Sequence, residues 1–247
     1  MAKIDINCDM GEVCANDAEL MNYVSSVNIA CGAHAGDAEI MRQTVENAIE
    51  KGVAVGAHPG YPDRENFGRI ALELSPPQIY DLITAQVISL QTIANECGSK
   101  ISHVKPHGAL YNQSARAPDL AAVIAQAVFD IDPRLILFGL SGSVSISAAK
   151  TAGLRTASEV FADRTYRSDG NLTPRTESNA LIHDTDIAIA QVMQMVNNGT
   201  VTATDGSVIP IKADTICIHG DGDNALAFIM SIRQSLIAAD IDVVAIN

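Results

Sequence analysis

Short apolar segments recur along the chain, and most of them end abruptly in a cluster of polar residues. Because these segments are short and bounded by turn-forming residues, they predict buried β-strands. The predicted strands cover residues 4–8, 27–30, 53–56, 101–104, 135–138, 154–157 and 215–218, and residues 241–246 are expected to form an eighth strand or a terminal edge.

Helical periodicity appears between the strands. The predicted helices cover residues 38–51, 76–97, 119–130, 143–152, 185–198 and 224–239, the last after an Asp223 cap. Regular alternation of strand and helix predicts parallel pairing, because each crossover between parallel strands needs a helix to return the chain. No linker divides the sequence. We therefore expect one α/β domain over residues 1–247, either a parallel β/α barrel or an open sheet.

Reactive side chains gather directly after the predicted strands. Barrels and open α/β sheets place their active sites at the carboxyl ends of their strands, so this pattern predicts an enzyme. The candidate catalytic residues are Asp9, Glu12, His34, His58, Lys105, His107 and His219.

Several of these residues allow more than one interpretation. Asp9 and Glu12 fit a metal ligand with a base, or a pair of carboxyl groups whose mutual repulsion raises the pKa of one of them for proton transfer; Glu12 is alternatively a helix cap. Asp9, His34 and His58 form a two-histidine, one-carboxylate set that suits zinc and other divalent ions. Each histidine is alternatively a general base or a hydrogen-bonded structural residue.

Two further motifs suggest anion chemistry. Lys105 is suited to stabilise an oxyanion or a phosphoryl group, or alternatively to pair with an acid such as Asp9, whereas His103 fits a hydrogen-bonded residue within the barrel. The segment His219-Gly-Asp221 precedes a helix, whose amino terminus binds anions, although its acidic residues oppose a bare phosphate unless they hold a metal. The sequence contains no P-loop motif.

Two long loops, at residues 57–74 and 159–178, are rich in arginine. Ordered loops of this length are usually functional, and arginine recognises carboxylate and phosphate groups. An anionic substrate is one interpretation, and ion pairs with Asp63 and Asp163 within the loops are the other. The loop arginines are Arg64, Arg69, Arg164, Arg167 and Arg175.

Composition narrows the class of protein. The formal net charge of −13 argues against binding to nucleic acid. Five cysteines without a CxxC pair favour free thiols in a reducing compartment. The sequence shows no apolar run long enough to span a membrane and no signal segment. These features predict a cytoplasmic protein.

Several motifs taken together resemble the LamB/YcsF family, the 5-oxoprolinase A-subunit family of bacteria. The resemblance covers essentially the whole chain. Three positions depart from the family pattern: Cys8, where alanine is common; Val13, where glycine is common; and Ala33, where an aromatic residue is frequent. The motifs are DINCDMGE at 5–12, NIACGAHAGD at 28–37, GAHPGYPD at 56–63, KPHGALYN at 105–112, EVFADR at 159–164 and HGD at 219–221.

The resemblance implies a distorted seven-stranded β/α barrel similar to those of polysaccharide deacetylases and glycoside hydrolases. It also implies ATP-dependent opening of the 5-oxoproline lactam to L-glutamate, with Mg²⁺ accompanying ATP and two further subunits, B and C, as partners. Lys105 is then expected to contact the transferred phosphoryl group. The expected substrate-binding residues are Asn7, Arg64, Tyr111, Asp163, Arg164 and Asp221.

Two other functions fit the same residues. A stand-alone deacetylase or amidohydrolase that uses a divalent metal would bind that ion tightly and turn over without ATP. A non-catalytic sensor would bind a small acid, but a simple binding pocket rarely needs so many titratable groups.

Overall fold

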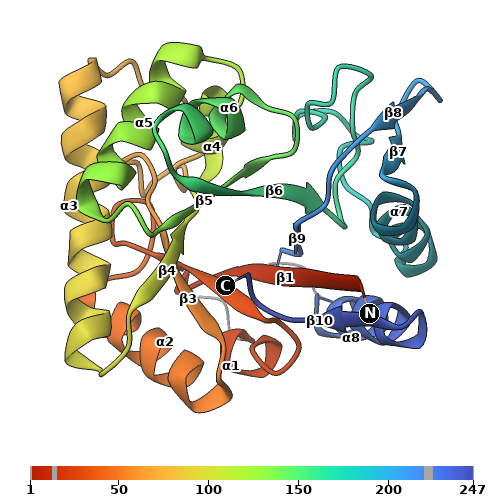
Figure 1. Ribbon diagram of the computed structural model, residues 1–247, viewed down its shortest axis with the longest axis horizontal. Helices are drawn as coiled ribbons and strands as arrows, with labels where there is room; N and C mark the ends of the chain where they lie inside the picture. The colour runs from red at the N-terminus through yellow and green to blue at the C-terminus, as the bar shows by residue number, and fades with distance from the viewer. Residues whose placement is uncertain (1, 13–15, 220–224, 247) are drawn as a thin grey trace.

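Seven parallel strands close into a barrel in the computed structural model, which describes residues 2–12, 16–219 and 225–246 (Figure 1). Each strand pairs with its neighbour, and β9 closes the ring by pairing with both β6 and β1. This architecture confirms the predicted parallel β/α barrel. The barrel strands are β1 (Ala2–Met10), β2 (Ser26–Ala30), β3 (Ala54–His58), β4 (Ile101–Val104), β5 (Ile136–Leu140), β6 (Arg155–Phe161) and β9 (Thr215–Cys217).

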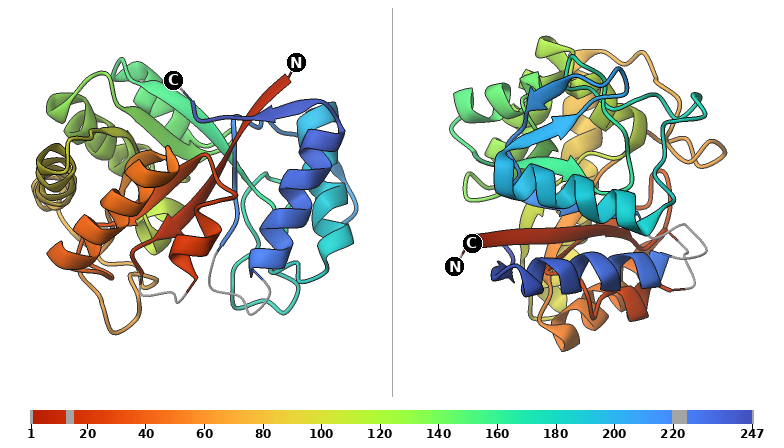
Figure 2. Two further views of the ribbon diagram at one scale, coloured as in Figure 1. Left: turned by 90° about the horizontal axis from the view of Figure 1, so that it is seen from below. Right: turned by 90° about the vertical axis from the view of Figure 1, so that its right-hand side faces the viewer.

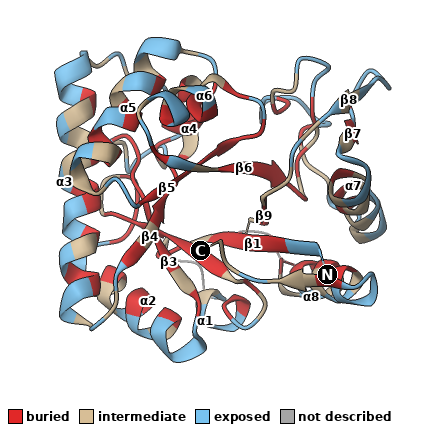
Figure 3. Cartoon of the chain, in the orientation of Figure 1, coloured by how far each residue is buried: buried red, intermediate tan, exposed pale blue. Residues whose placement is uncertain are grey.

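Helices surround the barrel, and their outward faces are largely exposed (Figure 3). Two of them, α7 and α8, pack against each other beside a small antiparallel hairpin of β7 (Thr200–Thr202) and β8 (Val208–Pro210) (Figures 1 and 2). The helices are α1 (Asp17–Leu20), α2 (Ala38–Lys51), α3 (Pro76–Glu96), α4 (Gly108–Ser114), α5 (Pro118–Ile131), α6 (Val144–Thr151), α7 (Thr185–Asn198) and α8 (Ala225–Ala238).

Local sequence signals fix the ends of the longer helices. Asp37 caps α2 by accepting hydrogen bonds from the amides of Glu39 and Ile40, and the helix ends at Gly52 with φ 66°. Ser75 and Gln78 form a capping box at the start of α3, where Pro76 needs no hydrogen-bond partner.

The interior of the barrel is polar along β1. Ile4, Ile6, Cys8 and Met10 belong to the apolar core. The alternate residues Asp5, Asn7 and Asp9 form hydrogen bonds with side chains of other barrel strands. Because successive side chains of a strand point to opposite faces, one strand thus supplies both the packing against the helices and a column of polar groups inside the barrel.

A second, smaller apolar cluster packs against the polar interior of the barrel. Ile136, Phe138 and Ala157 form a separate buried cluster, with Ile246 packed against it. The His103 ring stacks on Phe138 at 4.1 Å between ring centroids and bonds Asn28 Oδ1 at 2.9 Å. His103 is therefore a hydrogen-bonded residue of the barrel interior, as the sequence predicts.

Some elements differ from the sequence prediction. The sixth strand continues to Phe161 instead of ending near residue 157, and its continuation buries the polar residue Glu159, which bonds Asn7 inside the barrel. The sequence pattern does not predict α1, α4 or the β7–β8 hairpin. Residues 241–246 form the short edge strand β10 (Ile241–Val243), paired with the start of β1. The predicted cap at Asp223 lies outside the described residues. Within the described part, no helix has the length and apolar character needed to cross a membrane.

Candidate functional site

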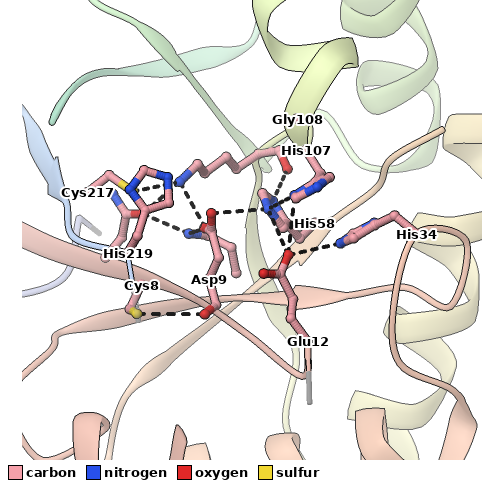
Figure 4. Close-up of polar contacts among 12 residues, drawn as sticks. Cys8, Asp9, Glu12, His34, His58, His107, Gly108, Cys217 and His219 are labelled. Carbon is pink, nitrogen blue, oxygen red and sulfur yellow. Dashed lines mark hydrogen bonds and ion pairs between the residues drawn. The ribbon is translucent and has the colours of Figure 1, made fainter. Parts of the chain in front are cut away.

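The residues predicted at separate strand ends meet around one cavity of about 390 Å³ at the carboxyl-terminal mouth of the barrel. Six of the seven predicted catalytic residues line it, and His34 lies behind Glu12, 3.0 Å from its carboxylate. In Figure 4, Asp9 lies between His219 on one side and His58 on the other. The lining residues among the candidates are Asp9, Glu12, His58, Lys105, His107 and His219.

Lys105 is the buried cation at the bottom of this cavity, only 2% exposed. Its ammonium lies 2.9 Å from Asp9 Oδ1 and 2.8 Å from Glu159 Oε1, and it donates a hydrogen bond to Asn7 Oδ1 at 3.2 Å. Burial alone would lower the pKa of Lys105, but the Asp9 carboxylate holds it well above its ordinary value. Lys105 therefore remains charged in a site largely screened from water.

Asp9 joins the lysine to the histidines. Its Oδ1 also accepts a hydrogen bond from Asn28 at 2.8 Å, and its Oδ2 lies 3.3 Å from His58 Nε2. Burial would raise the pKa of Asp9, but His58 and Lys105 lower it well below its ordinary value. Asp9 is therefore a fixed carboxylate between two potential proton donors.

Two histidines face each other beside Asp9. His58 Nδ1 lies 2.7 Å from the Lys105 carbonyl oxygen, and His107 Nε2 lies 2.8 Å from the Phe67 carbonyl oxygen. A carbonyl only accepts hydrogen bonds, so each of these nitrogens carries a proton. The remaining nitrogens, His58 Nε2 and His107 Nδ1, are 2.9 Å apart.

Glu12 completes the cluster of histidines. Its Oε1 lies 3.2 Å from His107 Nδ1 and 3.0 Å from His34 Nε2. Burial would raise the pKa of Glu12, but the contacts with His107 and His34 lower it to about 2. Burial lowers the pKa of His34 to about 4, so this ring is neutral. Its Nε2–H donates a hydrogen bond to the Glu12 carboxylate. His34 Nδ1 is buried with no hydrogen-bond partner among the described residues.

Asp17, the first residue of α1, holds the turn that presents Glu12. Its Oδ2 accepts a hydrogen bond from the Gly11 amide at 2.8 Å, whereas its Oδ1 is buried without a partner in the described part of the chain. Burial raises the pKa of Asp17 to about 6. The ionised form is therefore disfavoured in the folded state.

We expect Asp17→Asn to stabilise the protein above pH 6. The variant keeps the acceptor for Gly11 and removes a charge whose folded-state pKa of about 6 exceeds the ordinary value of 3.8. Because a raised carboxyl pKa makes folding less favourable as pH rises through that interval, the two proteins should converge near pH 4. Chemical unfolding across pH 4–8 measures the difference; equal stability at pH 7 would contradict this assignment.

His219 forms a second acid–base pair on the opposite wall. Its Nδ1 lies 2.6 Å from Asp163 Oδ2, and its ring stacks on Phe161 at 5.8 Å between centroids. Burial would raise the pKa of Asp163, but the nearby His219 ring lowers it. The Asp163 carboxylate accepts a hydrogen bond from His219 Nδ1–H, so His219 Nε2 is the basic nitrogen. This arrangement is typical of general-base histidines.

The predicted substrate-binding residues occupy different positions. Tyr111 and Arg164 line the cavity, and the Tyr111 hydroxyl is buried without a hydrogen-bond partner among the residues that the structure describes. Asn7 lies beneath Lys105 and donates to Glu159 and Thr215. The Arg64 guanidinium instead donates to the carbonyls of Gly32 and Gly36 and serves the loop. Asp163 bonds His219 and is absent from the cavity lining, and Asp221 lies outside the described residues.

Some of the loop arginines lie where an anion-binding role requires them, and others do not. Arg69, Arg164 and Arg175 line the cavity, and Arg116 of the segment after α4 joins them. Arg167 instead pairs with Glu177 at the surface. Four arginines therefore line the same cavity as Lys105, a concentration of positive charge that suits an anionic ligand.

The sequence pattern does not identify two important residues of the site, Glu159 and Asn28. Glu159 is fully buried and bonds both Lys105 and Asn7. Asn28 joins Asn7, Asp9 and His103. Both lie inside strands rather than after them, so a search confined to strand ends does not find them. Their signal is a polar side chain at an inward position of an otherwise apolar strand.

Comparisons with known proteins agree with this architecture. Residues 4–247 match the sequence profile of the LamB/YcsF family. The chain is 50% identical to the 5-oxoprolinase A-subunit of Brevibacillus brevis, over 99% of this chain and 98% of that protein. It is also 50% identical to the 5-oxoprolinase A-subunit of Bacillus licheniformis, over the full length of both.

Solved structures give the same result for the fold. The lactam utilization protein from Thermus thermophilus is 39% identical with a TM-score of 0.93, over 99% of this chain and 100% of that one. A family 4 carbohydrate esterase from Streptomyces lividans matches with a TM-score of 0.51 at 14% identity, over 100% of this chain and 93% of that one. The second similarity concerns the barrel fold alone.

Proposed function

Because this chain belongs to the LamB/YcsF family, we propose that it is the subunit of an ATP-dependent 5-oxoprolinase that binds 5-oxoproline and opens its lactam to L-glutamate. The observation that carries the proposal is the position of Lys105. A buried ammonium lies in a cavity lined by two histidines that each pair with a carboxylate, His58 with Asp9 and His219 with Asp163.

The substrate explains why such a site is needed. A five-membered lactam is a resonance-stabilised amide, and its hydrolysis at neutral pH is slow. Transfer of a phosphoryl group from ATP to the carbonyl oxygen makes the ring carbon electrophilic and converts that oxygen into part of a leaving group. Water then attacks the carbon, and the carbon–nitrogen bond breaks with a proton going to nitrogen, which leaves an acyl phosphate. A second water cleaves the acyl phosphate to the glutamate carboxylate and inorganic phosphate.

The residues of the cavity suit separate parts of this reaction. Lys105 Nζ stabilises negative charge on the carbonyl oxygen or the transferred phosphoryl group. His219 Nε2, oriented by Asp163, accepts a proton from the attacking water. His219 Nε2, once protonated, is suited to give this proton to the leaving nitrogen.

The arginines of the cavity wall support an anionic substrate. Arg164 is the buried member of this group, 5% exposed, and donates to the carbonyls of Thr173 and Ala180. We propose that the substrate carboxylate and the phosphates of ATP, with Mg²⁺ accompanying the ATP, approach through this wall. We also propose that two further subunits, B and C, complete the enzyme and that it works in the cytoplasm.

A reconstituted assay tests the proposal. The purified chain is mixed with subunits B and C, and glutamate release from 5-oxoproline is measured with ATP, without ATP, and with each protein omitted. The proposal predicts release only when the three proteins and ATP are all present. Release by this chain alone without ATP would instead support a stand-alone amidohydrolase and would reject the proposed function.

A further inference from the structure

Two imidazole nitrogens with lone pairs face each other beside the cavity. The protons on His58 Nδ1 and His107 Nε2 are both directed at backbone carbonyls. In the neutral rings, His58 Nε2 and His107 Nδ1 therefore both present lone pairs, at a separation of 2.9 Å. Two lone pairs at this distance repel each other unless a proton or a metal ion lies between them, and each can satisfy both nitrogens.

Glu12 supplies a third donor atom next to this pair. Its Oε1 lies 3.2 Å from His107 Nδ1 and 3.8 Å from His58 Nε2. A point equidistant from these three atoms, in their common plane, lies about 2.0 Å from each of them. This distance matches the roughly 2.0–2.2 Å bonds that Zn²⁺ forms with imidazole nitrogen and carboxylate oxygen. One ion therefore reaches all three atoms without movement of a side chain.

We propose that Glu12 Oε1, His58 Nε2 and His107 Nδ1 bind a divalent transition-metal ion such as Zn²⁺. The backbone carbonyls that fix the two histidine tautomers are the kind of outer partner that metal-binding histidines have. All three ligand residues line the cavity, so a further coordination position faces the space where a substrate binds. Two imidazoles and one carboxylate favour a transition metal over Mg²⁺, which prefers oxygen ligands.

His34 has a supporting role in this site. It does not line the cavity, and its Nε2 donates to the same Glu12 oxygen at 3.0 Å. Its ring stacks on that of His107 at 3.8 Å between centroids. A Cβ on Gly60 would lie 2.6 Å from His34 Nδ1, so glycine at that position leaves room for the ring. His34 therefore orients two ligand residues.

Charge favours a cation at this position. Asp9, Glu12 and Glu159 bring three carboxyl groups to the site, and Lys105 is the ammonium among them. A second group of donor atoms, from Asp9, Cys217 and His219, is also close enough to share an ion. Lys105 Nζ lies 3.1 Å from Cys217 Sγ, however, and its positive charge opposes a metal there.

Isothermal titration of the chelator-treated chain with Zn²⁺, and separately with Mg²⁺, tests the inference. The titration uses the chain alone, without ATP, 5-oxoproline or the other two proteins, so its outcome is independent of the proposed function. We expect one equivalent of Zn²⁺ to bind, with no comparable binding of Mg²⁺. Absence of saturable Zn²⁺ binding to the wild-type chain would overturn the inference.

Variants identify the ligands. Glu12→Gln, His58→Gln and His107→Gln each remove a donor and should weaken Zn²⁺ binding by more than about 100-fold, whereas His34→Gln should cost about 10–100-fold, as outer partners of metal ligands do. His183→Gln changes an exposed histidine outside the cluster and should leave binding unchanged. Circular dichroism verifies the fold of each variant.

Cys217→Ser distinguishes the two groups of donor atoms. This variant should retain Zn²⁺ affinity, because Cys217 is not among the proposed ligands. Loss of binding in Cys217→Ser with retention in His107→Gln would place the ion at the second group and contradict the inference.

Discussion

Lys105→Met is expected to abolish ATP-dependent release of glutamate from 5-oxoproline in the reconstituted complex. The substitution keeps the apolar stem of the side chain and removes the ammonium that contacts Asp9 and Glu159. Loss of one well-placed group that stabilises developing negative charge typically lowers kcat by about 10²–10³-fold. Lys105→Met also removes the positive charge that neutralises two carboxyl groups, so we expect a loss of kcat at the upper end of this range or beyond it. Steady-state measurement of glutamate formation provides the test.

The same substitution should reduce stability. Removal of one partner from a buried ion pair costs about 3–5 kcal/mol, so circular dichroism must verify that the variant is folded at the assay temperature. Lys150→Met provides a matched control, because Lys150 is an exposed lysine of α6 far from the described contacts of the cavity. Near wild-type turnover by folded Lys105→Met would reject the role assigned to Lys105.

Gly56→Ala is expected to destabilise the barrel by about 3 kcal/mol or more, at the upper end of the cost of overpacking a core. A Cβ on Gly56 would lie 2.0 Å from His103 Nε2. The His103 ring has no room to retreat, because it stacks on Phe138 and bonds Asn28. For a protein of this size, a loss of about 3 kcal/mol lowers the melting temperature by about 6–12 °C.

Gly206→Ala is the control for the glycine substitution. Gly206 has φ 86°, and a Cβ there would meet no atom of the described residues within 4 Å. Its replacement should therefore cost only the backbone strain of a left-handed residue, about 1–2 kcal/mol. Thermal unfolding monitored by circular dichroism compares the two variants. A smaller loss for Gly56→Ala than for Gly206→Ala would show that the His103 ring does not fill the space beside Gly56.

Much of the fold follows from local patterns in the sequence. The apolar segments that precede His34, His58, Lys105 and His219 are all barrel strands, and parallel pairing brings their carboxyl ends to one mouth. This geometry explains why residues far apart in sequence can be grouped from the pattern alone. The closed seven-stranded ring follows only from the resemblance to the LamB/YcsF family, because strand–helix alternation does not distinguish a barrel from an open sheet.

The details of the site depend on long-range packing. Residue types group Asp9 with His34 and His58 as a metal set, but the side chain that joins these histidines to His107 is Glu12. Residue types suggest Asp9 as a partner of Lys105, which the structure confirms, but they do not indicate the second carboxylate, Glu159. Arg64 and Arg164 likewise occupy similar loops, and both donate to backbone carbonyls, yet only Arg164 lines the cavity.

A crystal structure of the chain with 5-oxoproline, soaked together with a non-hydrolysable ATP analogue, tests the central claim most directly. The account predicts the lactam in the cavity between Lys105 and His219, with its carbonyl oxygen within hydrogen-bond distance of Lys105 Nζ. A separate cavity, lined by Lys3, Thr156 and Ile246, lies at the opposite end of the barrel. Ordered 5-oxoproline there, with the first cavity empty, would contradict the account.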